Sequence, residues 1–263
     1  MMLLRKLIKI SFLTKTMKKK ISLCLWGWGA RGFIHIGVLR YLEENGYEIE
    51  EVSGTSMWAI VWAAIALGMT ADEIYDFVKT EFSYWKLIDF SFWKWVVAGD
   101  KLFKKLKEVY GKTKVSATHI PLKIVATDLS DCSMKVFDDG LMLDAVRASL
   151  SVPILFKPHI IDWKPYVDGM LSENLPLSVL SWNHIIAVST AMSLECKYKT
   201  TKDIGTKSFN KSLYNNEAIS IYKCDKHVEL IRPIYDDIDF LDFHKYDKIV
   251  KIGYQAAQEY FAK

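Results

Sequence analysis

The chain has 263 residues, of which 51% are apolar and 25% are charged, and its formal net charge is +4. This composition can bury a large core and excludes intrinsic disorder, collagen and coiled coil as the main character of the chain. The mild charge gives no domain-wide basic excess, so we expect no nucleic-acid partner. The four cysteines are far apart in sequence, which favours reduced thiols and a cytoplasmic protein.

Residues 1–17 form an N-terminal extension in which lysines and Arg5 interrupt the apolar residues. This pattern lacks the apolar run and the cleavage site of a signal peptide. We expect the extension to be disordered, or an artefact upstream of a true start at Met17; a basic amphipathic segment that touches anionic lipid is the alternative. Residues 18–263 are expected to form a single domain. Their longest apolar run, 58–69, is too short to cross a membrane.

The first half of the domain reads as strand, loop, helix, strand and helix. The apolar run 21–26 predicts a buried strand, and helical spacing of apolar residues follows the glycine-rich segment 27–32. A second short strand ends at Val52, and the wholly apolar segment 57–67 predicts a central buried helix.

The second half continues the alternation. Thr70 and Glu73 have the spacing of a capping box and predict the start of a helix. The aromatic and basic segment 84–110 is expected to be a mobile, cap-like or helical insertion, which could form a lid facing lipid or an ordinary helical cover over the sheet. We further expect strands within 121–129, 164–170 and 184–190, a helix over 141–153, a surface loop over 197–217 and an amphipathic helix over 247–262. Strands that alternate with helices predict an α/β fold with a mostly parallel sheet.

The segment GWGARG (27–32) lies between a predicted strand and a predicted helix. Alone, it matches the G-x-G-x-x-G pattern of dinucleotide-binding proteins, for which Glu48, Glu50 and Glu51 would be the candidate acidic residues. The same amides, beside the N-terminus of a helix, could instead stabilise negative charge on an oxygen.

The segment GTSMW (54–58) matches four of the five positions of G-x-S-x-G, with Trp58 in place of the last glycine. That motif presents a serine on a tight turn between a strand and a helix, which predicts Ser56 as a nucleophile. The alternative is that Ser56 only caps the helix that follows.

Asp168 precedes Gly169 at the end of a predicted strand. A carboxylate there could be the general base for Ser56, or it could be an ordinary turn residue. Considered together, an amide-rich loop, a nucleophile turn and an Asp-Gly turn indicate acyl-transfer chemistry.

Four segments resemble, in order, the sequence blocks of the bacterial-type patatin-like phospholipase family. They are WGWGARGFIHIGVLR (26–40), SGTSMWAIVWA (53–63), VRASLSVPILFKP (146–158) and WKPYVDGMLSENLP (163–176). The resemblance implies an α/β fold in which helices sandwich a mostly parallel central sheet in three layers.

The resemblance also implies a Ser–Asp dyad, with Ser56 as the nucleophile and Asp168 as the general base. The residues of the oxyanion hole would be Gly27, Trp28, Gly29 and Ala30. The supporting residues would be Arg31, Gly32, Gly54, Trp58 and Gly169. Arg31 would either brace this loop or bind a phosphate headgroup, and we interpret His35, in the first helix, as structural.

The implied function is a serine lipid acyl hydrolase of the phospholipase A or esterase type. It would act on a phospholipid or another lipid ester, with peripheral membrane contact and without a metal or cofactor. The dinucleotide hypothesis leaves Ser56 and Asp168 without a role.

Five tryptophans occupy positions where the family usually has glycine: Trp26, Trp28, Trp58, Trp62 and Trp163. The chain has 13 glycines and 9 tryptophans, so glycine is about 5% of the residues against a usual value of roughly 7%. We hypothesise that these tryptophans are UGA codons, which some bacterial lineages read as glycine. If the indoles are real, the alternative function is a catalytically impaired lipid-binding or regulatory pseudoenzyme.

Overall fold

The computed structural model describes residues 18–263 except for 28, 82–89, 92–95, 98–99, 154, 192–199, 236 and 240–241. The N-terminal extension, Trp28 and most of the first half of the 84–110 segment therefore lie outside the described residues. Within the part that is described, no helix combines the length and the apolar character needed to cross a membrane.

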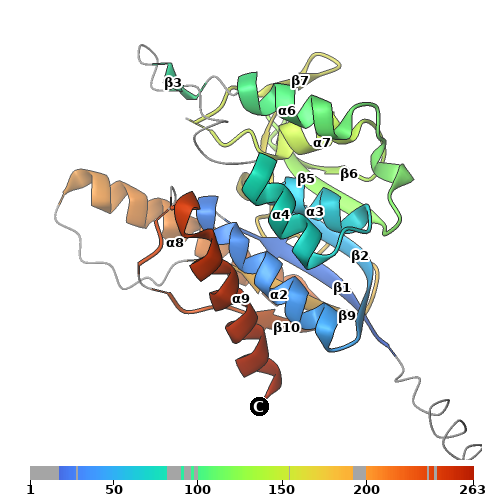
Figure 1. The fold of residues 1–263 in the computed structure, drawn as a ribbon. Helices are drawn as coiled ribbons and strands as arrows, with labels where there is room; N and C mark the ends of the chain where they lie inside the picture. The colour runs from blue at the N-terminus through green and yellow to red at the C-terminus, as the bar shows by residue number, and fades with distance from the viewer. Residues whose placement is uncertain are drawn as a thin grey trace, which may run out of the picture.

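The centre of the molecule is a mixed sheet of eight strands (Figure 1) in the order β10-β9-β1-β2-β5-β8-β7, with β6 also paired to β5. The strands are β1 (Lys19–Trp26), β2 (Tyr47–Thr55), β5 (Leu122–Asp128), β6 (Ser133–Phe137), β7 (His159–Ile161), β8 (Lys164–Asp168), β9 (His184–Ser189) and β10 (His227–Ile231). Pairing is parallel from β10 to β5 and antiparallel for β6, β7 and β8. A separate two-stranded ribbon joins β3 (Phe90–Ser91) and β4 (Val96–Val97).

One edge of β5 is shared by two strands. Its first half, Leu122–Val125, pairs in parallel with β2, and its second half, Ala126–Asp128, pairs in antiparallel fashion with β8. Because β6 overlaps both stretches, β6 occupies the opposite edge of β5. Strands β2 and β8 therefore run toward each other along one edge, and their carboxyl ends meet beside the middle of β5.

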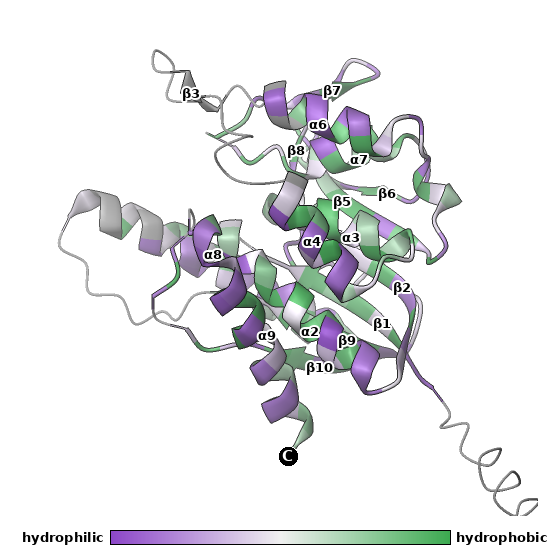
Figure 2. Cartoon of the chain, viewed as in Figure 1, coloured by the Kyte–Doolittle hydropathy of each residue, from purple (hydrophilic) through white to green (hydrophobic). Residues whose placement is uncertain are grey.

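Helices cover both faces of the sheet. One face carries α2 (Phe33–Glu44), α3 (Ala59–Ala66), α4 (Ala71–Glu81), α6 (Asp100–Tyr110), α7 (Met142–Ser149) and α9 (Tyr246–Phe261), and the other carries α8 (Thr201–Lys223). Side chains of β1 alternate between the two cores: Leu23 and Leu25 pack toward α2, whereas Cys24 and Trp26 pack toward α8. Figure 2 shows the central strands as predominantly apolar and the outer surfaces of the helices as mixed. The three-layer α/β architecture expected from the sequence is confirmed.

The expectation of a surface loop over 197–217 is wrong, because α8 begins at Thr201. This helix has many polar residues, and the buried ones among its described side chains lie along one narrow stripe, namely Leu213, Glu217 and Ser220. Two of these three are polar, so hydrophobic periodicity could not reveal the helix. The predicted capping box is present, since Glu73 Oε2 accepts from Thr70 N at 2.8 Å and Thr70 Oγ1 accepts from Glu73 N at 3.3 Å.

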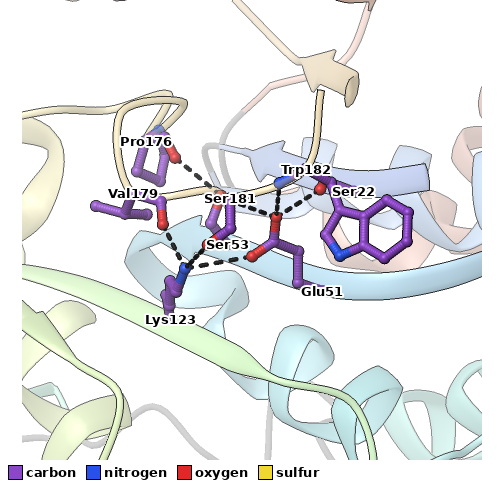
Figure 3. A network of polar contacts seen from close by, with 8 residues as sticks. All are labelled: Ser22, Glu51, Ser53, Lys123, Pro176, Val179, Ser181 and Trp182. Carbon is purple, nitrogen blue, oxygen red and sulfur yellow. Dashed lines mark hydrogen bonds and ion pairs between the residues drawn. The ribbon is translucent and has the colours of Figure 1, made fainter. Parts of the chain in front are cut away.

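An ion pair between the buried Glu51 and the partly exposed Lys123 fixes the sheet away from its carboxyl ends (Figure 3). Glu51 accepts hydrogen bonds from Ser22 Oγ and from the backbone N–H groups of Ser181 and Trp182, and its other oxygen lies 3.2 Å from Lys123 Nζ. Burial acts to raise the pKa of Glu51, but these hydrogen bonds and the lysine outweigh it and hold that pKa below its ordinary value. The network ties β1, β2 and β5 to the segment that precedes β9.

Candidate active site

Ser56 is the first residue after β2, and its backbone has a φ of 77°. This left-handed conformation is unusual for a residue with a side chain and is typical of a strained turn between a strand and a helix. The turn is held from outside, because Ser56 N donates to Ser149 Oγ at 2.9 Å and Ser149 Oγ donates to the carbonyl of Val125 at 2.7 Å. Ser56 therefore lies on a tight, left-handed turn between β2 and the helical segment that follows.

The hydroxyl of Ser56 lies 2.5 Å from Oδ2 of Asp168, in the position of a hydrogen-bond donor. Both residues are buried. The other carboxylate oxygen of Asp168 accepts from Met170 N at 2.9 Å, and Asp168 N donates to the carbonyl of Ser151 at 3.0 Å. The shared edge of β5 explains this meeting, because Ser56 follows the end of β2 and Asp168 ends β8.

Burial raises the pKa of Asp168 to about 7, although hydrogen bonds from Ser56 and Met170 act in the opposite direction. Among the described residues, the groups that shift this pKa are Ser56 and Met170, and neither is a cation. A carboxyl group with this pKa changes protonation state near neutral pH, which suits a general base.

Position 169 requires glycine because Val125 and Thr55 leave no space for a side chain there. A Cβ at this position would lie 2.4 Å from both the Val125 carbonyl oxygen and Thr55 Cγ2. Any larger residue would push β8 away from β2 and β5, and would separate Asp168 from Ser56. The glycine that follows Asp168 is therefore required by the close packing of the strands as well as by the turn.

The glycine-rich loop follows β1 and leads into α2. Gly29 has a φ of 55°, Ala30 is fully buried, and Gly32 precedes the first residue of α2. A Cβ on Gly27 would lie 2.6 Å from His35 Nε2, so a larger residue here would require the His35 ring to shift. The loop and the N-terminal end of α2 lie beside the elbow, because the indole of Trp58 contacts Gly29 and Gly32. Helix N-termini favour negative charge.

Arg31 braces this loop. Its Nε donates to the carbonyl of Ile238 at 3.0 Å, its guanidinium lies over the ring of Tyr235 at 5.6 Å, and only 4% of the residue is exposed. The side chain is thus directed toward the segment before α9. These contacts favour the bracing role over the headgroup role.

Trp58 fills the space between the elbow and the glycine-rich loop. Its Nε1 donates to the carbonyl oxygen of Gly29 at 2.6 Å, and its ring packs edge-on against Phe33 at 4.9 Å. The ring also lies against Gly32, where a Cβ would be 1.9 Å from the indole nitrogen. An indole therefore occupies the region where the predicted oxyanion loop faces the nucleophile turn.

Two other indoles are buried without a hydrogen-bond partner. The Nε1 atoms of Trp26 and Trp62 have none within the described part of the chain. Trp62 lies against Gly54, where a Cβ would be 2.1 Å from the indole nitrogen, and packs edge-on against His35. A buried, unpaired N–H costs about 1–3 kcal/mol.

Trp163, unlike the buried Trp26 and Trp62, is almost fully exposed to solvent. Asp162 and Trp163 form the two-residue turn between β7 and β8, with φ angles of 48° and 66°. Consecutive left-handed residues define the hairpin turn that favours Asp-Gly or Asn-Gly. The indole of Trp163 is 96% exposed, so no packing compensates for this backbone conformation.

The acidic residues required by the dinucleotide hypothesis have other roles. Glu51 is bound in the buried network of Figure 3, four residues before the end of β2, and Glu50 pairs with Lys20 at 2.7 Å. Glu48 lies 3.5 Å from Lys18. A ribose-binding carboxylate belongs at the carboxyl end of the second strand, which here carries Ser56.

His35 is buried, and burial lowers its pKa to about 3, so its ring is neutral. No contact with Ser56 is described for it. Ser149 and Ser151, which hold the backbones of Ser56 and Asp168, were not identified as site residues from the sequence. Both lie in the VRASLSVP segment, and only the tertiary contacts show what their hydroxyl and carbonyl groups do.

The fold and the site define a class: an α/β protein with a serine on a strained elbow, hydrogen-bonded to a buried aspartate. A family model described as Patatin-like phospholipase matches residues 23–181. That range is more than half of the chain and contains the elbow, the glycine-rich loop and Asp168. The chain belongs to the patatin-like phospholipase family.

Several known proteins are similar to this chain in sequence. An uncharacterized NTE family protein of Mycobacterium tuberculosis is 32% identical over 165 residues, covering 62% of this chain and 46% of that protein. Lysophospholipase NTE1 of Meyerozyma guilliermondii is 25% identical, covering 92% of this chain and 19% of that protein. Patatin-like phospholipase domain-containing protein 6 of Homo sapiens is 26% identical, covering 92% of this chain and 20% of that protein. The chain thus spans about half of the mycobacterial relative and about a fifth of the other two.

Among solved structures, VipD from Legionella pneumophila is similar, with a TM-score of 0.65 and 13% sequence identity. The match covers 98% of this chain and 72% of that one. At this identity the likeness concerns the fold, which it supports over nearly the whole chain.

Proposed function

We propose that this protein is a serine lipid acyl hydrolase in which Ser56 is the nucleophile and Asp168 is the general base. The membership of the chain in the patatin-like phospholipase family supports lipid hydrolysis in general. The observation that carries the dyad is the 2.5 Å hydrogen bond from Ser56 Oγ to Asp168 Oδ2 at a strained, buried elbow.

In the proposed reaction, Ser56 Oγ bonds to the carbonyl carbon of a lipid ester while its proton passes to Asp168. Backbone N–H groups of the 27–30 loop stabilise the negative oxygen, at roughly 3–4 kcal/mol per donor in comparable sites. The alcohol leaves with the proton held by Asp168. Water then attacks the acyl-serine as Asp168 accepts its proton. Asp168 returns that proton to Ser56 Oγ as the bond between Oγ and the acyl carbon breaks, which releases the fatty acid and restores Ser56.

An alkyl fluorophosphonate tests the nucleophile without knowledge of the natural lipid, because it bonds to an activated serine oxygen as fluoride leaves. We expect mass spectrometry to find the adduct on Ser56 and to find none in Ser56→Ala. Ser53→Ala is a matched control, because Ser53 lies on β2 three residues before Ser56 and donates to the carbonyl of Pro176 at 2.9 Å. The absence of an adduct at Ser56, both in the chain as written and in its Trp58→Gly variant, would contradict the proposal.

A pseudoenzyme is the second candidate, and the indole of Trp58 is the observation that favours it. Because this ring contacts both Gly29 and Gly32, it fills space that an ester carbonyl would need beside the 27–30 loop. In this case the protein would bind lipid without turnover. Binding to phospholipid vesicles would then survive Ser56→Ala, and no fluorophosphonate adduct would form.

We also propose that the native protein has glycine at the five tryptophan positions. Support comes from the left-handed, exposed Trp163, from the unpaired indole nitrogens of Trp26 and Trp62, and from the indole of Trp58 against Gly32. Peptide mass spectrometry of the protein isolated from its own source tests this directly. Glycine at 58 and 163 is expected; tryptophan there, or UGG codons, would overturn the proposal.

A further inference from the structure

Three potential metal ligands converge on the sheet far from Ser56. His184 and His227 are the first residues of β9 and β10, and Glu229 follows two residues later in β10. Glu229 Oε1 lies 2.5 Å from His184 Nε2 and 3.8 Å from His227 Nε2, and the two imidazole rings are 5.3 Å apart. One ligand atom from each residue falls within 4.8 Å of the others.

The sheet itself holds these three side chains together. His184 and His227 are direct register partners in the parallel pair β9–β10. Because side chains alternate along a strand, Glu229 points to the same face as His227. That face is the one covered by α9. Tyr260 of α9 lies near Glu229: burial is the main cause that raises the pKa of Tyr260, and the negative charge of Glu229 adds to it. Ligands on paired strands have less freedom than ligands on loops, so little ordering is required for an ion to bind.

The chemistry of this set matches a borderline transition metal. Imidazole nitrogens and a carboxylate oxygen are ligands of Zn²⁺, with bond lengths of about 2.0–2.2 Å and tetrahedral coordination. Ligand atoms around such an ion are about 3.3 Å apart, between the two separations found here. With its side chain 71% exposed, His227 can turn toward an ion and leave a fourth position for water.

We propose that His184, His227 and Glu229 bind Zn²⁺, and that the ion links β10, at the end of the sheet, to β9. The site lies at the amino ends of these strands, whereas Ser56 follows the carboxyl end of β2. The ion would therefore stabilise the sheet and take no part in ester hydrolysis. The alternative is an ordinary histidine–carboxylate hydrogen bond, like the one between His159 and Asp144 at 2.8 Å.

Titration with Co²⁺, a spectroscopic substitute for Zn²⁺, followed by Zn²⁺ competition, tests the proposal. We expect one ion per chain. The affinity should fall by more than about tenfold in His227→Gln and in Glu229→Gln, because replacing even a residue that only supports a metal ligand lowers metal affinity by about that factor. His159→Gln is the matched control, because it removes a histidine–carboxylate pair that lacks a second histidine, and it should bind as the unaltered chain does. Zn²⁺ should also raise the unfolding midpoint of the chain and leave that of His227→Gln unchanged.

Two results would overturn the site. One is the absence of Co²⁺ and Zn²⁺ binding at micromolar concentrations in the folded chain. The other is binding whose affinity and thermal shift are the same in His227→Gln, Glu229→Gln and the unaltered chain, which would place the ion elsewhere.

Discussion

The indole nitrogen of Trp58 donates a 2.6 Å hydrogen bond to the carbonyl oxygen of Gly29, and this bond joins the nucleophile elbow to the glycine-rich loop. The two segments that would cooperate in acyl transfer are thus connected by a side chain that fills the space between them. We expect Trp58→Gly to open that space. An oxyanion donor is worth about 10²–10³ in kcat, so hydrolysis of a nitrophenyl ester should rise by at least tenfold.

The control for this substitution is Trp182→Gly, which removes a partly exposed indole near the buried Glu51 network and far from Ser56. It should leave ester hydrolysis unchanged. If a folded Trp58→Gly protein hydrolyses the ester no faster than the unaltered chain, the indole is not what limits the site.

Trp163→Gly should stabilise the fold. The substitution relieves a left-handed backbone that an exposed indole does not compensate, at a cost of about 1–3 kcal/mol for a residue with a side chain. Urea unfolding at neutral pH measures the change. Asp162→Gly is the matched control in the same turn, and it should gain less because aspartate tolerates this conformation. Equal or lower stability of Trp163→Gly would argue that tryptophan belongs there.

Asp168→Asn should abolish ester hydrolysis and stabilise the protein above neutral pH. Because the folded pKa of Asp168, about 7, lies above its unfolded value, its contribution to stability is full below the unfolded pKa and is lost as pH rises through 7. The difference corresponds to on the order of 4 kcal/mol as an upper figure. Denaturant melts of both proteins at several pH values should show the advantage of Asp168→Asn growing from about pH 4 to about 7 and then levelling. A constant difference across this range would show that Asp168 does not change protonation state there.

The pH dependence of kcat/KM should have a rising limb with an apparent pKa near 7. A general base must be deprotonated to accept the Ser56 proton, so the rate increases as Asp168 ionises. The suitable protein for this profile is the five-glycine form, in which glycine replaces Trp26, Trp28, Trp58, Trp62 and Trp163. A rate that is already full at pH 5 would mean that burial does not raise the pKa of Asp168 in solution.

Lys123→Met should lower the free energy of unfolding by about 1.5–3 kcal/mol, because it removes a charged hydrogen-bond partner of the buried Glu51, whose serine and backbone donors remain. The expected loss is smaller when Glu51→Gln is added, since no unpaired charge then remains. Urea melts of the single and double variants measure this coupling. Additive losses would contradict the interpretation of Glu51 and Lys123 as an interacting ion pair.

Some parts of this fold could be predicted from local sequence and others could not. The runs that form β1 and α9 carry clear apolar patterns, and the structure places a strand and a helix there. Helix α8 was missed because its buried stripe is largely polar. Strand β10 was missed because only Ile231 among its residues is fully buried.

The site divides in the same way. Ser56 and Asp168 lie in short motifs whose chemistry can be read directly, so both could be named as candidates. Their separation of 2.5 Å could not be known, because it depends on β2 and β8 sharing one edge of β5. The convergence of His184 and His227 likewise depends on strand register, which nothing in the local sequence reveals.

The most direct test of the central claim is the hydrolysis of a medium-chain nitrophenyl ester by the form carrying Trp26→Gly, Trp28→Gly, Trp58→Gly, Trp62→Gly and Trp163→Gly. The same form with Ser56→Ala provides the background, and the chain as written provides the comparison. We predict turnover in the five-glycine form, abolished by Ser56→Ala and much weaker in the chain as written. Turnover that is absent, or that persists without Ser56, in a folded five-glycine protein would contradict the account.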